Sequence, residues 1–354
     1  MKGLSNQVDK RILKQQLHSS RVDRLTLSFY KYQRIDNPTD FRDRLFIKWK
    51  PLGILGRVYV AHEGINAQIS VEKNRYNDFK ESLMAFGFSK GLRLNTAIED
   101  NGKSFFLLKI QVKKKIVADG LNDETFNAGD SGKHLNATEF NALSEKPGTL
   151  VVDMRNHYES EVGHFKKAIC LDVDTFKSAL PVVEDLLKDQ KDNDIILYCT
   201  GGIRCEKASA WMKHRGFKNI FQLDGGIIEY ARQVKEQGLE NRFVGKNFVF
   251  DERLGERISP DVISVCHQCG NTCDTHTNCK NEGCHLLFIQ CSSCAREFDG
   301  CCSAACKKII ALPLPSQKEL RKGKAQGRMV YKKGRSENIK FKRSSEPNQA
   351  SEKK

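Results

Sequence analysis

The sequence predicts a multidomain protein of mixed α/β and α+β class, and three observations lead to this. Residues 25–112 show the order β-α-β-β-α-β, residues 135–238 alternate strand with helix, and residues 266–306 hold ten of the thirteen cysteines. A chain of 354 residues is long enough for several domains that each bury a core. We expect an N-terminal arm, a first domain, a linker, a second domain, a cysteine-rich domain and a basic disordered tail, with boundaries at 1–22, 23–118, 119–134, 135–238, 239–310 and 311–354.

The first domain has the pattern of a ferredoxin-like split unit. Strands are expected at 25–30, 56–61, 65–71, 91–98 and 104–112, with helices at about 38–50 and 73–86. Residues 56–70 also resemble an acylphosphatase-like module, and Arg57 and Asn66 would suit that enzyme. The enzyme also needs an anion-binding loop near its N-terminus, and we find no such loop in the sequence. We therefore expect an acylphosphatase-like fold that serves as a binding domain.

The second domain is expected to form a mostly parallel sheet with helices on both faces. Strands are predicted at 150–153, 169–171, 195–198 and 220–223, and helices at 138–143, 182–188, 205–215 and 226–236. Cys199 then lies just beyond the carboxyl end of a strand, where open α/β sheets place their ligands. Cys170 falls within an apolar strand, so we expect it in the core.

The most informative segment is 195–204, Ile-Ile-Leu-Tyr-Cys-Thr-Gly-Gly-Ile-Arg. A cysteine between a buried strand and a helix N-terminus meets converging backbone N–H groups and the positive end of the helix dipole, which favour the thiolate. Cys199 is therefore the predicted catalytic nucleophile, although a free cysteine is most often a small buried apolar residue. The two glycines allow the loop to curl with its amides inward, and the arginine would close the ring. The predicted active-site loop comprises Thr200, Gly201, Gly202, Ile203 and Arg204.

Residues elsewhere in the second domain are expected to support this loop. Asp153 and Arg155 follow a strand, and an ion pair between them would hold the segment next to Cys199. Glu159 and His164 would orient the same region. For all four, a purely structural role is the alternative. Cys205, one residue past the loop, would act as a resolving thiol or simply pack.

The loop resembles that of a rhodanese. It has four residues between cysteine and arginine, where cysteine phosphatases have five, and the smaller ring suits a sulfur atom. The resemblance extends to residues 151–168, a strand and turn beside the loop, and to residues 221–227. Three motifs in the expected order imply a rhodanese-like domain.

The cysteine-rich domain has the spacing of metal sites. Two Cys-x2-Cys pairs lie among interleaved histidines, and such pairs are the usual nuclei of two tetrahedral zinc sites. The segment is short and polar, so we expect metal rather than a core to supply its folding free energy. Zinc is favoured, as two structural ions, while an iron–sulfur cluster is the alternative, and the spacing does not pair the ligands. The candidate ligands are Cys266, Cys269, Cys273, Cys279, Cys284, Cys291, Cys294, Cys301, Cys302 and Cys306.

The net charge of +15 is concentrated in the C-terminal tail. Residues 307–354 contain fifteen Lys or Arg against four Glu. Such a segment is typical of a nucleic-acid partner, and a solvated terminus is the alternative. Neither an apolar stretch of about 20 residues nor an apolar signal core is present, so we expect a cytoplasmic protein with no membrane partner.

Taken together, the acylphosphatase-like front, the rhodanese-like loop and the cysteine pattern resemble the bacterial tRNA uridine 5-hydroxylase family of rhodanese-domain proteins. The resemblance covers about residues 20–310. It implies a tRNA-modifying oxidoreductase that converts the wobble uridine of the tRNA anticodon loop to 5-hydroxyuridine, with molecular oxygen as co-substrate and Cys199 essential. The sequence shows no flavin or nicotinamide motif, and the electron donor is unknown.

Two mechanisms and two other functions stay open at the sequence level. The Cys199 thiolate would add to C6 of the uracil, or Cys199 would carry a persulfide. The first alternative function is a persulfide sulfurtransferase acting in sulfur relay or tRNA thiolation. The second is a non-catalytic RNA-binding adaptor, against which the intact loop argues.

Overall fold

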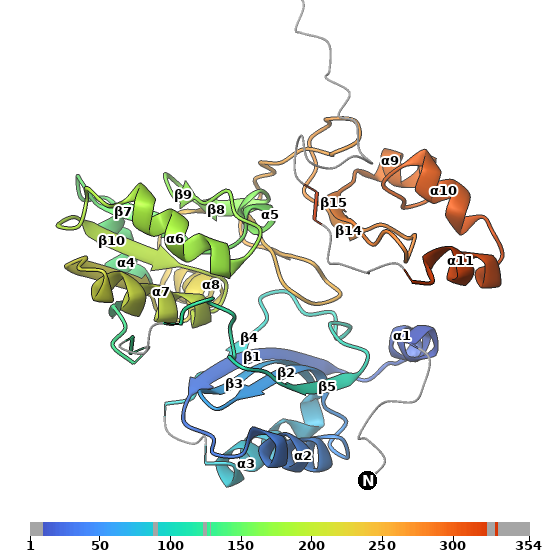
Figure 1. Cartoon of the computed structure of the whole chain (residues 1–354), viewed down its shortest axis with the longest axis horizontal. Coiled ribbons are helices and arrows are strands. Elements are labelled where there is room, and N and C mark those ends of the chain that lie inside the picture. Colours follow the sequence, from blue (N-terminus) through green and yellow to red (C-terminus); the bar gives the residue numbers. More distant parts are fainter. Residues whose placement is uncertain (1–9, 88–90, 123–125, 128, 324–329, 332–354) are drawn as a thin grey trace, which may run out of the picture.

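The computed structural model describes residues 10–87, 91–122, 126–127, 129–323 and 330–331. It contains a ferredoxin-like N-terminal domain, a central α/β domain and a C-terminal cysteine-rich domain (Figure 1). The predicted fold class is confirmed. Before the first domain, residues Lys10–Ser19 form helix α1, whose Lys14 donates to Glu252 at 2.7 Å.

The N-terminal domain is a five-stranded sheet of order β4-β1-β3-β2-β5. Helices α2 and α3 cover one face of this sheet, and its other side is turned toward the rest of the molecule (Figure 1). On the helix-covered face, Trp49 and Phe79 pack against Phe29. The elements are β1 (Arg24–Tyr32), α2 (Pro38–Trp49), β2 (Leu55–Ala61), β3 (Gly64–Glu72), a 3-10 turn (Lys73–Arg75), α3 (Tyr76–Ala85), β4 (Asn95–Thr96) and β5 (Leu108–Val112).

Local sequence explains most of these boundaries. Helix α2 begins at Pro38, whose missing N–H costs nothing in a first turn, and the Asn37 side chain caps it by accepting from Asp40 N at 3.0 Å. The expected strand at 91–98 shortens to β4, which pairs with β1 over two residues only. β5 adds to the split unit as a strand parallel to β2.

The central domain contains the predicted parallel sheet, with strand order β6-β11-β10-β7-β9. Helices α6 and α7 pack on one face, and α4 and α8 on the other. The elements are β6 (Lys133–Leu135), α4 (Ala137–Ser144), β7 (Leu150–Asp153), α5 (His157–Ser160), β8 (Gly163–Phe165), β9 (Ile169–Cys170), α6 (Phe176–Leu186), β10 (Asp194–Tyr198), α7 (Ile203–His214), β11 (Asn219–Leu223) and α8 (Gly226–Gln237).

Two predictions for this domain are wrong in detail. Helix α6 begins at Phe176, because Thr175 caps it through a bond from Ser178 N, and it continues through Pro181. Cys170 is exposed rather than part of the core. It ends β9, a two-residue strand at the edge of the sheet, where β7 is the one neighbouring strand among the described residues.

The C-terminal domain is joined to the central one through a shared sheet. Strand β12 (Phe243–Asn247) pairs with β8 and with β13 (Glu256–Arg257). The segment also has an apolar cluster of its own, in which Leu286 and Phe288 pack among the cysteines, so the expectation of a domain without a core is wrong. The remaining elements are β14 (His276–Asn278), β15 (Leu287–Ile289), α9 (Ser292–Glu297), α10 (Ala304–Ile310) and α11 (Leu314–Arg321).

The start of the predicted disordered tail is ordered. Residues Leu314–Arg321 form α11, and Arg321 pairs with Glu282. Val330 bridges to Leu287, and the ring of Tyr331 lies 4.0 Å from that of His267, between centroids. Most of the basic segment, 324–329 and 332–354, lies outside the described residues. Within the described part of the chain, we find no helix with the length and apolarity needed to cross a membrane.

Candidate active site and cysteine clusters

The loop after β10 has the predicted local geometry. Cys199 follows the strand directly, Gly202 N donates to its Sγ at 3.2 Å, and α7 begins at Ile203. Gly202 has φ of 98°, a conformation that favours glycine. Burial alone would raise the pKa of the Cys199 thiol, but hydrogen bonds from Cys205 and from the amides of Arg204 and Cys205, with the Arg204 charge, lower the pKa to about 6. The thiolate is therefore the major form at neutral pH.

Arg204 closes the loop through its side chain. Its guanidinium donates to both Glu159 oxygens, at 2.7 and 2.9 Å, and to Thr200 Oγ1 at 3.4 Å. Glu159 is fully buried and also accepts from Asn156 N at 3.0 Å. The arginine charge is thus balanced by a carboxylate and still acts on the nearby Cys199 sulfur.

Asp153 and Arg155 form the predicted ion pair, with both side chains fully buried and Nη2 2.6 Å from Oδ2. Asp153 also accepts from the hydroxyl of Tyr198, the residue before Cys199, at 2.8 Å. This bond ties the end of β10 to the ion pair. His164 lies elsewhere: its Nδ1 is 3.0 Å from the Phe165 carbonyl, and with Cys170 it lines a separate surface depression.

The structure adds contacts to the loop that the sequence analysis missed. The Tyr30 hydroxyl, from β1, donates to Glu206 at 2.9 Å, and a Cβ at Gly202 would lie only 2.8 Å from that hydroxyl. The Tyr32 hydroxyl donates to the Ile203 carbonyl at 3.4 Å. The N-terminal domain therefore packs against the loop, and Cys199 is fully buried.

A buried lysine reinforces this contact. Lys207, on α7 and 1% exposed, lies 2.9 Å from Glu63 and 2.6 Å from Asp119. A lysine on the helix face that packs against a sheet indicates a charged partner, because lysine is rarely buried unless it is paired. Its partners lie 144 and 88 residues away, so sequence alone could not name them.

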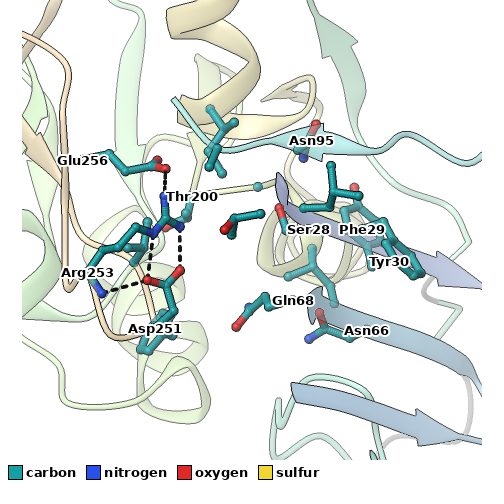
Figure 2. A pocket seen from close by; sticks show the side chains of 18 residues that line it. Ser28, Phe29, Tyr30, Asn66, Gln68, Asn95, Thr200, Asp251, Arg253 and Glu256 are labelled. Carbon is teal, nitrogen blue, oxygen red and sulfur yellow. Dashed lines mark hydrogen bonds and ion pairs between the residues drawn. The ribbon is translucent and has the colours of Figure 1, made fainter. Parts of the chain in front are cut away.

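A pocket opens where the three domains meet (Figure 2). Its cavity volume is about 90 Å³, and its walls come from β1, β3 and β4, from the loop, and from residues 249–256. Thr200 of the loop lies on one side, and Ser28 and Asn95 on another, while Gly201 also lines the pocket. The pocket thus places polar groups of the N-terminal domain beside the residues that follow the nucleophile.

The remaining wall is charged, and its arginine pairs with two carboxylates. Arg253 pairs with Asp251 at 2.5 Å and with Glu256 at 2.6 Å, as Figure 2 shows. Burial raises the pKa of Glu256. Phe250 adds an aromatic surface to the same wall.

Eight cysteines form two groups that could each hold a metal ion. Within each group, all four Sγ atoms lie within 4.8 Å of one another. Cys269 and Cys291 are 3.6 Å apart, and Cys302 lies 3.7 Å from both Cys284 and Cys306. Tetrahedral zinc with bonds of about 2.3 Å separates its sulfurs by about 3.8 Å, so the spacing fits one ion per group. The groups are Cys266, Cys269, Cys291 and Cys294, and Cys279, Cys284, Cys302 and Cys306.

Two of the ten candidate ligands lie outside these groups. Cys273 accepts from Thr275 N at 3.5 Å, and Cys301 is fully buried among the apolar residues of the domain. His267 is also engaged elsewhere, since its Nδ1 accepts from Ile289 N at 3.1 Å and its Nε2 lies 2.8 Å from Glu161. The ligand sets are therefore all-cysteine.

Family models match all three domains. The model described as UPF0176 acylphosphatase like domain matches residues 24–116, that of the rhodanese-like domain matches 136–233, and that described as rhodanase C-terminal matches 244–307. The fold and the loop accordingly define a rhodanese-domain protein with an acylphosphatase-like front.

Curated relatives narrow this class. The tRNA uridine(34) hydroxylase of Pectobacterium atrosepticum is 54% identical over 336 residues, which is 95% of each chain. Those of an Enterobacter species and of Photorhabdus laumondii are 52% and 53% identical, over 95% of this chain and 96% of theirs. The chain belongs to the tRNA uridine(34) hydroxylase family. The predicted resemblance is confirmed, and the hydroxylase interpretation is supported over the sulfurtransferase alternative.

Two of the solved structures that this chain resembles each cover about a third of it. A rhodanese-like domain from Anabaena is 20% identical with a TM-score of 0.26 and covers 32% of this chain and 78% of that one. A rhodanese-like protein from Staphylococcus aureus is 22% identical with a TM-score of 0.24 and covers 28% of this chain and 90% of that one.

Proposed function

We propose that this protein hydroxylates C5 of the wobble uridine, position 34, of tRNA in the cytoplasm, with Cys199 as the catalytic residue. The observation that carries the proposal is the position of Cys199, a thiol with a pKa of about 6, at the loop that borders the interdomain pocket. Membership of the tRNA uridine(34) hydroxylase family supports the choice of substrate.

In the proposed reaction, a nucleophile adds to the base before oxygen reacts. Addition of the Cys199 thiolate to C6 of uracil would make C5 electron-rich enough to react with molecular oxygen. One uridine, one oxygen molecule, two electrons and two protons then give 5-hydroxyuridine and water, and the thiolate leaves C6 as the product re-forms its double bond. An external donor supplies the two electrons.

The cover over Cys199 shapes how the substrate reaches the sulfur. The thiol is fully buried and Tyr30 lies against Gly202, so the base must enter from the pocket and displace part of this contact. An anticodon loop presents unstacked bases, which suits entry into a pocket with an aromatic side chain such as Phe250. Within the loop, Gly202 N donates to the Cys199 sulfur, and Arg204 stabilises the charge of the thiolate.

For the C-terminal domain, we propose two structural zinc ions, one in each four-cysteine group. The single-ion spacing of the sulfurs supports zinc over a four-iron cluster, because a cluster inserted between the ligands would hold them farther apart. Zinc bound there would neutralise thiolates that otherwise repel one another and would hold β15, α9 and α10 together.

Nucleoside mass spectrometry of total tRNA tests the proposed activity. A strain lacking this protein should lose the 5-hydroxyuridine-derived nucleosides that depend on it, and expression of the full chain should restore them. Unchanged nucleosides in the deletion strain, with no second protein of the same family present, would contradict the proposal.

A further inference from the structure

Asn95 stands out among the polar residues of the interdomain pocket. It lies on β4, paired through its backbone with Ser28 of β1, and it is 6% exposed. Its side-chain Oδ1 is buried and has no hydrogen-bond partner among the described residues. Leaving a buried amide oxygen unpaired costs free energy, so such a group in a pocket wall indicates a missing ligand.

The position of Asn95 links it to the reactive loop. A Cβ placed on Gly201 would lie 3.6 Å from Asn95 Nδ2, so the amide faces the second residue after Cys199. Both residues line the same pocket, and Figure 2 shows Asn95 across from Thr200 on the side of Ser28. A ligand bound to this amide therefore lies beside the loop.

Two other polar side chains on the pocket wall are already engaged. Asn66 Nδ2 donates to the Ile116 carbonyl at 3.2 Å. Arg253 is held by Asp251 and Glu256. Glu256 Oε2 is a second buried acceptor of this wall without a partner among the described residues, but the same carboxylate is already held through Oε1 by Arg253 and by Ile98 N. Asn95 offers an acceptor and a donor side by side, so its side chain is the better candidate for binding the edge of a base.

We propose that Asn95 is a specificity-determining residue that binds the Watson–Crick edge of the uracil base, an inference that rests on the proposed function. Its Oδ1 accepts from the uracil N3–H and its Nδ2 donates to O4. This pairing satisfies the buried oxygen and leaves the opposite C5–C6 edge of the base free for reaction at the loop. An amide is suited to this edge because it offers an acceptor and a donor side by side.

The test measures binding of an anticodon stem-loop RNA that carries either uridine or 3-methyluridine at position 34. The N3-methyl group removes the donor that Asn95 would accept. Wild-type protein should bind the uridine RNA about tenfold more tightly, and Asn95→Ala should lose this preference because the pairing no longer exists. Asn95→Asp, of nearly the same shape, should also weaken binding of the uridine RNA because its carboxylate repels O4.

Asn101→Asp is the matched control. It adds the same charge to an exposed position of the same domain, where the side chain already accepts from Lys103 N and a carboxylate can do so too. Its affinities should equal those of the wild type. Far-ultraviolet circular dichroism and thermal unfolding of each variant separate loss of binding from loss of fold.

Single-turnover hydroxylation of the same RNAs separates this inference from the proposed function. A tenfold or greater fall in rate for Asn95→Ala at low RNA concentration, with wild-type protein active, supports both. An Asn95→Ala protein that still prefers uridine over 3-methyluridine overturns the role of Asn95, whatever the activity. A wild-type protein that binds with the expected preference, from a strain whose deletion leaves the 5-hydroxyuridine-derived nucleosides unchanged, contradicts the proposed function alone.

Discussion

The loop around Cys199 and the two four-cysteine groups share one local feature, a backbone N–H that donates to a cysteine sulfur, but they differ in role. In the loop, Gly202 N donates to Cys199 Sγ at 3.2 Å; in the groups, Cys291 N donates to Cys266 Sγ at 3.3 Å and Cys302 N to Cys279 Sγ at 3.4 Å. Each backbone amide favours a thiolate. The geometry of a single cysteine therefore does not separate a reactive thiol from a metal ligand.

The difference lies in the number of sulfurs and in the cation beside them. Cys199 has one balancing side chain, Arg204, and that charge is shared with Glu159. Each group instead brings four sulfurs within 4.8 Å, and four close thiolates are stable only around a cation. One thiolate next to a pocket suits catalysis, whereas four thiolates around one ion suit structural stabilisation.

The largest effect should come from replacing the single thiolate. Cys199→Ser should abolish 5-hydroxyuridine formation without unfolding the protein, because a serine hydroxyl stays protonated at neutral pH. Nucleoside mass spectrometry of tRNA from a complemented deletion strain measures this. Cys170→Ser, at an exposed position, serves as the control and should retain full activity. If the Cys199→Ser protein still forms 5-hydroxyuridine, Cys199 is not the nucleophile, and the loop does not differ from the four-cysteine groups in the way described.

Replacement of one cysteine in a four-cysteine group should reduce metal binding rather than remove the reactive thiolate. Cys291→Ser should lower the zinc content from about two ions per chain to about one and should loosen the C-terminal domain. Metal analysis by mass spectrometry of the purified protein gives the ratio. Cys273→Ser should keep both ions, since Cys273 lies in neither group. Absence of metal from the wild type, or the visible absorbance of an iron–sulfur cluster, would contradict the zinc assignment.

The Arg204–Glu159 pair should be more important for stability than any exposed pair. Glu159→Gln leaves the buried Arg204 charge without its carboxylate, and we expect a loss of about 3–5 kcal/mol in the free energy of unfolding. The matched control, Glu145→Gln, breaks the more exposed pair with Arg242 and should cost less than about 1 kcal/mol. Urea denaturation followed by fluorescence compares them. Equal losses would show that the loop gains no special support from Glu159.

The pH dependence of single-turnover rate should report the Cys199 thiolate. Because the pKa of Cys199 is lowered to about 6, the deprotonated form dominates above that value and is lost as pH falls through it. The rate should therefore be level from pH 7 to 8 and fall about tenfold per unit well below pH 6. A rate that keeps rising to pH 9 would indicate that the pKa of Cys199 is that of an ordinary thiol. It would contradict the stabilised thiolate that distinguishes Cys199 from the other cysteines.

The smallest effect should come from the basic tail, which belongs to neither region. Truncation after Tyr331 preserves α11 and the buried Tyr331 ring, and it removes residues 332–354. If these residues bind tRNA phosphates, log affinity should depend less steeply on log salt, by something under about one unit for each phosphate that the shortened chain no longer neutralises. Catalysis at saturating tRNA should persist. Equal salt slopes for both proteins would shift the binding surface to the folded domains.

The sequence by itself determined the features that depend on neighbouring residues. The β10 strand, Gly202 and the start of α7 follow from ten consecutive residues, since strand burial, glycine conformation and helix initiation are local. The order of the three domains and the presence of metal-ligand spacing were predictable for the same reason. The Asp153–Arg155 ion pair also joins residues two positions apart and was predictable from the sequence.

Only the tertiary structure decided which distant groups meet. Tyr30 and Asn95 reach the loop because the sheet of the N-terminal domain packs against it, more than 100 residues later in the chain. The cysteines sort into two groups through the pairing of β14 with β15 and the turns around α9 and α10, which leave out Cys273 and Cys301. Cys170 is exposed because its strand lies at the sheet edge. Such contacts depend on how separate elements pack, and strand or helix propensity does not determine that packing.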